Sequence, residues 1–370
     1  MGEVHVFTSA AANYLPKVRV LFQSLRRWRP DWRLHLVLAD TPPAAAVLAA
    51  AGADEVHTLA DLGVPNWRAW AFCHSLVELA TAIKPFALRK LLARPDAGVA
   101  IYLDPDVVVF SRLEEIERAL GAADIVLTPH QIEAERTVGG IIAKEICTAQ
   151  HGIYNLGFIA VAARDEGRAF ADWWAMRTYH FCRQDIPNGL FTDQRWIDFV
   201  PGLFDRVKIL RSPAFNVARW NLTTRRLEGD RRSGLTVNGE PLGFFHFSGI
   251  DSDPKAPAGD QAKGAELVRW YRRETRVQKV ERPGQAAWGF AAFADGAAIA
   301  PEQRWVYRLR GDLQAAFADP FASAPGGYQD WWRGQAGIEF PDLFDLATRA
   351  AELRRLSGAL TTGYAPFPDG

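Results

Sequence analysis

One stretch decides the fold of this chain: Val99-Ala100-Ile101-Tyr102-Leu103-Asp104-Pro105-Asp106-Val107-Val108-Val109-Phe110. A short apolar run rich in β-branched residues is typical of a buried strand. Two carboxylates interrupt the run, and Pro105 between them has no N–H to give to a sheet. Because burying unpaired carboxylates costs on the order of several kcal/mol, the strand must end there. The stretch therefore predicts a strand that delivers Asp104 and Asp106 to a surface crevice.

The spacing of the two aspartates favours a metal site. Residues two apart in an extended chain lie on the same side, roughly 6.5 Å apart. One hydrated divalent cation can bridge that span. The alternative is a strand that ends in a turn with two solvated aspartates. The apolar residues on both sides of the pair favour the metal site over two solvated aspartates. Pro105 would then stiffen the turn that aims both aspartates at one ion.

Composition indicates an ordinary globular protein. The chain has 370 residues, 48% of them hydrophobic, and a formal net charge of zero, which provides no electrostatic case for binding nucleic acid. Its three cysteines form no close-spaced pair, so no disulfide framework or zinc knuckle is signalled. The N-terminus opens on a strand pattern without a signal-like segment, and no run of 18 apolar residues occurs. We expect a cytoplasmic protein, and peripheral association with the inner face of the membrane stays open.

Strands and helices alternate through the first hundred residues, which predicts βαβ units on a largely parallel sheet. The predicted strands cover 4–8, 34–38, 55–59 and 99–104, and the predicted helices cover 16–28, 43–51 and 67–93, the last broken near 84–85. Ligands of such sheets bind beyond the carboxyl ends of the strands. Residues 8–14, Asp40 and the two aspartates all fall there. Neither a dinucleotide-binding G-x-G-x-x-G nor a P-loop is present.

The remainder of the chain completes one α/β domain and adds a helical extension. We expect a helix over 113–120, an irregular, mobile loop over 129–150, a helix around 170–177, and strands over 124–128, 153–162, 207–210 and 244–247. The predicted domains are residues 1–250, a linker at 251–265 rich in Pro, Gly and Asp, and a mostly helical extension at 266–370.

An ordered set of motifs gives the chain a family resemblance over residues 4–255. The motifs are Thr8-Ser9-Ala10-Ala11-Ala12-Asn13-Tyr14, Ser24-Leu25-Arg26, Lys84-Pro85, Tyr102-Leu103-Asp104-Pro105-Asp106, Tyr154-Asn155-Leu156-Gly157, Asp193-Gln194, Phe215-Asn216 and His246-Phe247-Ser248-Gly249. Together they resemble bacterial glycosyltransferases of the GT-A fold, similar to the retaining family 8 transferases of surface-polysaccharide biosynthesis. The resemblance implies a Rossmann-like mixed sheet flanked by helices.

The resemblance also implies a metal-dependent transfer of a sugar from a nucleoside-diphosphate donor, UDP in the first instance, to a glycan, lipid-linked or protein hydroxyl, with retention of configuration. Asp104, Asp106 and His246 would hold Mn²⁺ or Mg²⁺. A cation at the diphosphate stabilises the leaving group, and an imidazole ligand favours Mn²⁺. Asp193 and Gln194 would lie at the reacting carbon. The implied donor-binding residues are Thr8, Ser9, Ala10, Asn13, Tyr14, Asp40, Lys84, Asp104, Asn155, Gly157 and Gly249.

Several of these residues also have a purely structural interpretation. His246 could be a hydrogen-bonded histidine in an aromatic strand, and Lys84 an exposed helix lysine. Asp193 could lie in the first turn of a helix capped by Thr192. His130, placed after a predicted strand, is a positional candidate for the acceptor side. The family's lysine after the histidine motif is replaced by Ser252, and the nearest lysine is Lys255.

Two other functions compete with the transferase. An inactive nucleotide-sugar-binding scaffold would fit the same fold, although the intact Asp104, Asp106, Asp193 and His246 count against it. A haloacid-dehalogenase-like phosphatase also follows an apolar strand with D-x-D. That family carries the motif on its first strand, whereas at least three predicted strands precede it here.

Overall fold

The computed structural model describes residues 2–250, 262–278 and 288–362, and its centre is a seven-stranded mixed sheet. The strand order is β10-β6-β7-β4-β1-β2-β3. The bounds are β1 (Glu3–Ala10), β2 (Arg33–Leu38), β3 (Glu55–His57), β4 (Ala97–Leu103), β6 (Ile125–Pro129), β7 (Tyr154–Ala162) and β10 (Val207–Ile209). Strands β1 to β4 are parallel, β10 is parallel to β6, and β7 is antiparallel to both β4 and β6. The predicted α/β class with a mixed, helix-flanked sheet is confirmed.

Successive side chains of the central strands pack into two separate hydrophobic cores, one on each face of the sheet. Phe7, Val37 and Tyr102 belong to the core on one face, whereas Val6, Leu36 and Ile101 belong to the core on the other. Successive strand side chains point to opposite faces, so a strand buried on both sides is hydrophobic throughout. The helices of the first face are α3 (Trp67–Phe72), α4 (Leu76–Ala82), α5 (Lys84–Leu92) and α9 (Asp165–Phe181), and those of the second are α1 (Leu15–Trp28) and α6 (Glu114–Ala122).

The predicted helix over 67–93 is divided into three. The first break precedes Ser75, which accepts a hydrogen bond from the Glu78 N–H, while the Glu78 carboxylate accepts one from the Ser75 N–H. This reciprocal capping box starts a new helix. The second break lies at Ile83, and Pro85 occupies the first turn of α5, where its missing N–H costs nothing. The break near 84–85 was predicted, and the one at Ser75 was missed.

A second, three-stranded sheet lies beside the end of β4. Its order is β11-β15-β5, with bounds β11 (Val217–Ala218), β15 (Phe244–His246) and β5 (Val107–Val109). The β5 strand runs antiparallel to β15, with His246 opposite Val107. Smaller elements are α2 (Ala45–Ala49), the β8 (Arg183–Asp185) and β9 (Leu190–Thr192) hairpin, α10 (Val200–Leu203), and the ribbon of β12 (Leu227–Asp230), β13 (Gly234–Val237) and β14 (Glu240–Pro241).

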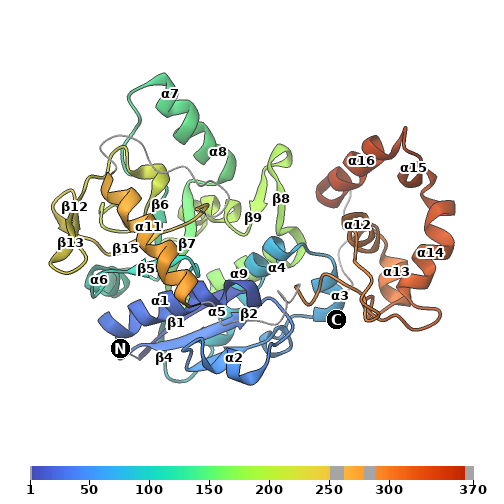
Figure 1. The fold of residues 1–370 in the computed structure, drawn as a ribbon, viewed down its shortest axis with the longest axis horizontal. Helices are drawn as coiled ribbons and strands as arrows, with labels where there is room; N and C mark the ends of the chain where they lie inside the picture. Colours follow the sequence, from blue (N-terminus) through green and yellow to red (C-terminus); the bar gives the residue numbers. More distant parts are fainter. Residues whose placement is uncertain (1, 251–261, 279–287, 363–370) are drawn as a thin grey trace.

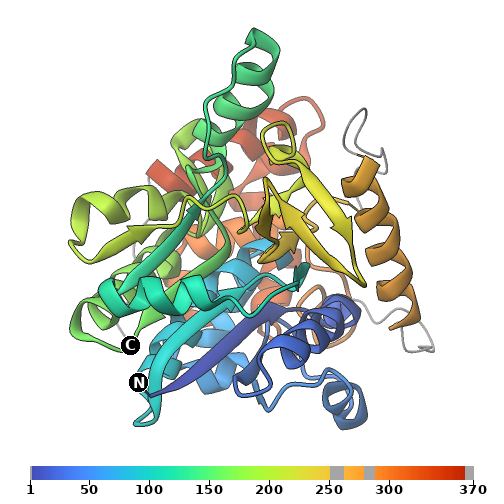
Figure 2. The same ribbon diagram turned by 90° about the vertical axis from the view of Figure 1, so that its left-hand side faces the viewer.

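The expectation of an irregular loop over 129–150 is wrong for its second half. Residues 138–151 form a continuous helical segment made of α7 (Val138–Gly140), a π-helical stretch (Ile141–Ile146) and α8 (Cys147–His151). Thr137 caps it by accepting a hydrogen bond from Gly140 N–H. The adjacent glycines suggested a loop, but this cap and the apolar residues that follow support a helix. The segment projects from the body in Figures 1 and 2.

The described part of the C-terminal region is mostly helical. Helix α11 (Ala262–Val277) packs on α1 and lies beside the β12–β13 ribbon (Figure 2). Helices α12 (Pro301–Leu309), α13 (Gly311–Ala316), α14 (Tyr328–Glu339), α15 (Pro341–Phe344) and α16 (Arg349–Thr362) form a separate group next to α3 (Figure 1). The Phe72 ring joins this group to α3 through edge contacts with Tyr307, Phe321 and Tyr328.

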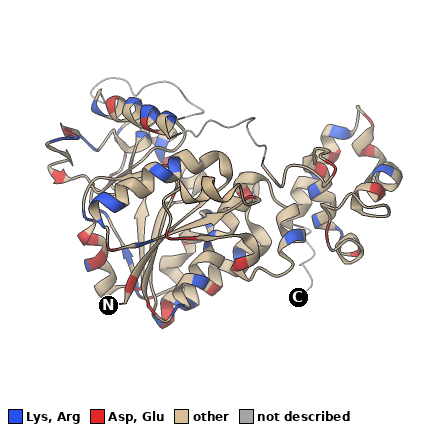
Figure 3. Ribbon diagram, turned by 60° about the horizontal axis from the view of Figure 1, so that its bottom comes forward, with Lys and Arg blue, Asp and Glu red and all other residues tan. Residues whose placement is uncertain are grey.

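The predicted linker at 251–265 lies outside the described residues up to position 261, and 262–265 already belong to α11. Acidic and basic residues are interspersed over the described elements (Figure 3). Among the described helices, none is both long and apolar enough to cross a bilayer.

Candidate functional site

Asp104 and Asp106 lie in a tight turn between β4 and β5. The Asp104 carbonyl accepts a hydrogen bond from Val107 N–H at 3.0 Å, which closes a β-turn with Pro105 at its second position. Proline favours that position because its ring presets the required φ. The Asp104 N–H donates to the Gly157 carbonyl of β7 at 2.9 Å. The extended geometry expected for the pair is therefore wrong. A turn brings the carboxylates closer than a strand would.

His246 reaches the two aspartates from the neighbouring strand β15. Its Nε2 lies 3.1 Å from Asp106 Oδ1 and 3.5 Å from Asp104 Oδ2. One ligand atom from each of the three residues lies within 4.8 Å of the others. The backbone fixes this approach, since Phe247 N–H donates to the Asp106 carbonyl at 2.8 Å.

Asn155 sets the tautomer of His246. The Asn155 Oδ1 atom accepts a hydrogen bond from Gly157 N–H at 3.0 Å, so it is the carbonyl end of the amide. The His246 Nδ1 atom lies 3.1 Å from the same oxygen and must therefore carry the proton. Nε2 then presents its lone pair to the aspartates when the ring is neutral. A histidine held through its other nitrogen is the usual arrangement of a metal ligand.

The three residues fit a divalent cation. His246 is buried, and its Nε2 has no hydrogen-bond partner of good geometry among the described residues. Two carboxylates and one imidazole suit Mn²⁺, and the carboxylates also suit Mg²⁺. Burial alone would lower the pKa of His246, but the carboxylates of Asp106 and Asp104 outweigh it and raise the pKa. The negative charges of Asp104 and Asp106 favour any positive charge at Nε2. A proton and a divalent cation therefore compete for this atom.

Lys84 is buried, so its interpretation as an exposed helix lysine is wrong. Its Nζ lies 3.1 Å from Asp193 Oδ2, 3.5 Å from Asp104 Oδ1, and donates to the Leu156 carbonyl at 3.2 Å. Burial would lower the pKa of Lys84, but Asp104 and Asp193 outweigh it and raise the pKa. The ammonium thus stays charged and joins Asp193 to the turn that carries Asp104.

Asp193 and Gln194 lie after β9, and the expected helix cap at Thr192 is wrong. Thr192 has a left-handed φ of 47°, and the 3-10 helix that follows covers Arg195–Phe199, with Gln194 at its cap position. The Gln194 Oε1 atom accepts from Leu156 N–H and its Nε2 donates to the His151 carbonyl, each at 2.9 Å. Burial raises the pKa of Asp193, against the opposing charge of Lys84.

The predicted donor loop is connected to the site through Ser9. Ser9 Oγ lies 3.0 Å from Tyr102 Oη, whose hydroxyl donates to Asp104 Oδ1 at 2.5 Å. Asp40 instead accepts hydrogen bonds from the backbone of Ala12, Thr41 and Gly289. Thr8 and Ala10 are buried in β1, Asn13 is exposed, Tyr14 is 36% exposed, and Gly249 has φ of 71°. Ser252 and Lys255 lie outside the described residues.

Sequence reasoning assigned no site role to two residues of the quoted motifs, Tyr102 and Asn216. Tyr102 precedes Asp104 by two positions, and residues two apart in a strand lie on the same face. This spacing could have indicated the contact between the Tyr102 hydroxyl and the Asp104 carboxylate. Asn216 is fully buried with a left-handed φ of 53°, and its Oδ1 lies 3.4 Å from His246 Nδ1. Asn is one of the few residues other than Gly that adopt this conformation readily. His130, the positional candidate, accepts from Asn155 Nδ2 at 3.0 Å and so belongs to the same network.

Gly157→Ala is expected to displace His246. An added Cβ would lie 2.3 Å from His246 Cε1 and 2.5 Å from Nδ1. Overpacking of this kind costs about 1–3 kcal/mol, and we expect at least about a tenfold loss of Mn²⁺ affinity. Calorimetric titration with Mn²⁺ and denaturant unfolding measure both effects. Gly121→Ala is the matched control, because its Cβ meets nothing within 4 Å in α6. Unchanged Mn²⁺ affinity in Gly157→Ala would contradict the placement of His246.

Comparison with known proteins gives distant similarities. No family model matches the chain. It is 26% identical over 180 residues to the uncharacterized protein YfnF of Bacillus subtilis (strain 168), which covers 46% of this chain and little more than half, 56%, of YfnF. It is 23% identical over 258 residues to the uncharacterized protein YfnD of the same organism, which covers 68% of this chain and 79% of YfnD.

The solved structures similar to this chain include the galactosyltransferase LgtC in complex with donor and acceptor sugar analogs. That match has 17% identity, covers 76% of this chain and 98% of LgtC, and has a TM-score of 0.43. The glycosyltransferase GlyE of Streptococcus pneumoniae TIGR4 matches at 14% identity over 77% of this chain and 66% of GlyE, with a TM-score of 0.44. At these scores, inferences about activity rest on the residues of the site.

Proposed function

We propose that this protein is a metal-dependent glycosyltransferase of the GT-A type, similar to family 8. It moves a sugar from a nucleoside-diphosphate donor, UDP in the first instance, to a hydroxyl of a glycan, lipid-linked or protein acceptor, with retention of configuration. Two lines support the proposal. The ordered motifs resemble that family, and several of those motif residues meet around one candidate metal centre.

The observation that carries the proposal is the placement of His246 Nε2 between Asp104 and Asp106, with its lone pair oriented by Asn155. The three side chains lie just beyond the carboxyl end of β4, where ligands of open α/β sheets bind. A divalent cation held there would neutralise the charge that develops on a diphosphate leaving group. Asp104, Asp106 and His246 are the residues that would hold it.

The remaining side chains of the site position the reacting groups. Lys84 places a buried positive charge beside both Asp104 and Asp193, where it orients the two carboxylates. We assign Asp193 to binding the donor sugar, because its buried carboxylate can accept hydrogen bonds from the sugar hydroxyls. The oxygen and the nitrogen of the Gln194 carboxamide are both hydrogen-bonded to backbone groups. These two bonds hold the side chain in one rotamer. We place it near the face of the sugar opposite the leaving group.

The test is donor turnover by the purified protein. A panel of UDP-, GDP- and dTDP-sugars is incubated with Mn²⁺, and release of the nucleoside diphosphate is measured with and without a chelator. We expect release from one class of donor, dependent on the metal, and transfer of the sugar to an added acceptor. NMR of the product then gives the anomeric configuration.

Other outcomes of the same assay separate the competing functions. Donor binding by calorimetry without turnover on any acceptor would favour the inactive nucleotide-sugar-binding scaffold. Release of inorganic phosphate from phosphate esters, with sugar nucleotides left intact, would favour the phosphatase. Absence of both donor binding and metal-dependent turnover would overturn the proposal.

A further inference from the structure

Three histidines on adjacent strands form a row at the edge of the main sheet, away from the site described above. His5 in β1, His35 in β2 and His57 in β3 are all buried. His5 Nδ1 lies 2.9 Å from His35 Nε2, and His35 Nδ1 lies 3.1 Å from His57 Nε2. An apolar residue at any of these positions would pack without needing a partner, so the row of imidazoles calls for an explanation.

A carboxylate completes the row at its outer end. Glu55 Oε2 lies 3.9 Å from His35 Nδ1 and 3.9 Å from His57 Nε2. A point equidistant from these three atoms, given their separations of 3.1, 3.9 and 3.9 Å, lies about 2.1 Å from each. Ligand distances to Zn²⁺ are about 2.0–2.1 Å for imidazole nitrogen and about 2.0–2.2 Å for carboxylate oxygen. Ligand atoms of tetrahedral Zn²⁺ lie about 3.4 Å apart, so the two imidazole nitrogens are already close enough, and the Glu55 carboxylate would need to move inward by about 0.5 Å.

Asp96 favours the tautomers that such a site needs. His5 Nε2 is buried without a hydrogen-bond partner among the described residues, and the Asp96 carboxylate lies 3.6 Å from it. A proton on His5 Nε2 faces this negative charge favourably, so His5 Nδ1 is the acceptor and His35 Nε2 the donor of their hydrogen bond. The lone pair of His35 then lies on Nδ1, on the side of His57 and Glu55. Hydrogen bonding of a ligand's second nitrogen is typical of metal sites.

We propose that His35, Glu55 and His57 bind one zinc ion. Two imidazoles and one carboxylate, with a fourth position left to water, form a zinc ligand set, whereas Mg²⁺ prefers oxygen ligands throughout. Arg94 orients the carboxylate by donating to Glu55 Oε2 at 3.1 Å.

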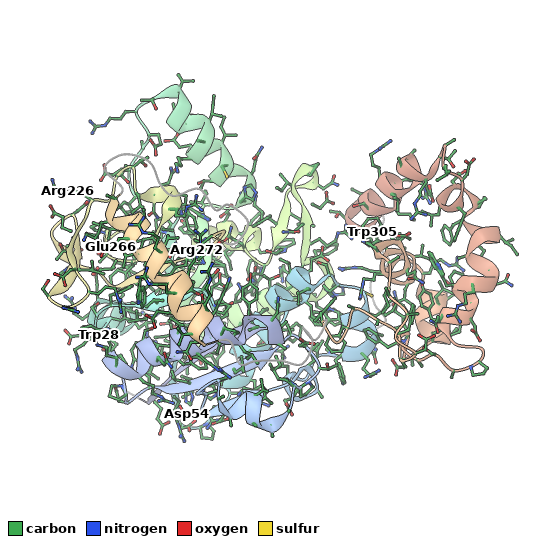
Figure 4. The ribbon with its side chains drawn as sticks, in the orientation of Figure 1. Trp28, Asp54, Arg226, Glu266, Arg272 and Trp305 are labelled. Atoms are coloured by element: carbon green, nitrogen blue, oxygen red, sulfur yellow. The ribbon has the colours of Figure 1, made fainter. Side chains whose placement is uncertain are left out.

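The position of the site points to a structural role. His35, the third residue of β2, pairs with Glu55, the first residue of β3, whereas Asp104 lies beyond the carboxyl end of β4. Figure 4 shows Asp54, which directly precedes Glu55, at the periphery of the body and far from α7 and α8. The β3 strand has three residues and lies at the edge of the sheet. A zinc ion between His35 and His57 would tie this short edge strand to β2.

The experiment uses the full-length chain freed of metal and titrated with Co²⁺ as a spectroscopic substitute for Zn²⁺. His246→Gln is titrated in parallel, because the site of Asp104, Asp106 and His246 also offers an imidazole to Co²⁺. We expect the intense visible absorption of four-coordinate Co²⁺ at one equivalent, and its loss when one equivalent of Zn²⁺ is added. Zinc is also expected to raise the melting temperature, since a ligand that binds only the folded state stabilises it.

Four variants locate the site. Glu55→Gln and His57→Gln are expected to lower the Co²⁺ affinity by at least about 100-fold and to remove the zinc-dependent rise in melting temperature. Glu3→Gln, an exposed carboxylate of the adjacent β1, and His246→Gln are expected to keep both signals. Glu55 is 33% exposed, so Glu55→Gln should fold, and its circular dichroism without metal checks this. Absence of the absorption in wild type, or its persistence in Glu55→Gln and His57→Gln, overturns the proposal.

Discussion

Asp106→Asn is expected to lower metal-dependent donor turnover by about 1,000-fold while the protein remains folded. The variant keeps the shape of the side chain and an oxygen 3.1 Å from His246 Nε2, but it removes one of the two negative charges that would hold the cation. A metal at a developing negative charge supplies several kcal/mol of transition-state stabilisation, and about 4 kcal/mol corresponds to three orders of magnitude in rate.

The Asp106 comparison needs three measurements. Nucleotide release gives the rate, Mn²⁺ titration by calorimetry gives the affinity, and denaturant unfolding confirms the fold. Asp172→Asn on α9 is the control, because this exposed carboxylate pairs only with Arg89 in the described contacts and lies outside the site. Turnover within a few-fold of wild type in Asp106→Asn would exclude this residue as a metal ligand.

Lys84→Met is expected to destabilise the folded protein by about 3–5 kcal/mol. The Lys84 side chain is 4% exposed and that of Asp193 is 2% exposed, so removal of the ammonium leaves a buried carboxylate without its counter-charge. Breaking one partner of a buried ion pair costs this much because the remaining charge cannot be solvated. Urea unfolding followed by far-UV circular dichroism measures the change.

A double variant distinguishes this charge effect from lost packing. Lys84→Met combined with Asp193→Asn removes both charges, so we expect it to be less destabilised than the sum of the single variants, with a coupling of about 1–3 kcal/mol. Simple additivity of the two changes would show that Lys84 and Asp193 do not form the buried pair. Since both residues belong to the proposed site, all three variants should lose donor turnover.

Much of the fold could be predicted because burial and periodicity are local properties of the chain. The strand before Asp104, the alternation of strands and helices up to that point, and the break at Pro85 were all predicted from patterns of a few residues. The helix over 138–151 was missed because Gly139 and Gly140 outweighed the apolar residues after them. The turn stiffened by Pro105 was predicted and is confirmed by the hydrogen bond from Val107 N–H to the Asp104 carbonyl. The extended spacing of the two aspartates was wrong, because the place where β5 pairs is not a local property of the strand pattern.

The candidate site also has a part that could be predicted from the sequence and a part that could not. Asp104, Asp106 and His246 were predicted as one ligand set, the histidine through the family resemblance, and the structure places their ligand atoms within 4.8 Å of one another. The burial of Lys84 could not be predicted, because a lysine at the start of a helix is usually solvated. Its environment is built by Asp193, from a hairpin about a hundred residues later.

The sequence by itself determined which groups are available. It specifies an apolar strand that must end at two carboxylates, and a proline suited to the turn between them. Only the tertiary structure decided how these groups are protonated and what they face. Asn155 directs the His246 lone pair to the aspartates, Lys84 is charged because two carboxylates surround it, and three histidines align because their strands are neighbours. The physical reason is that protonation and ligand geometry depend on distances of a few ångströms between residues far apart in the chain.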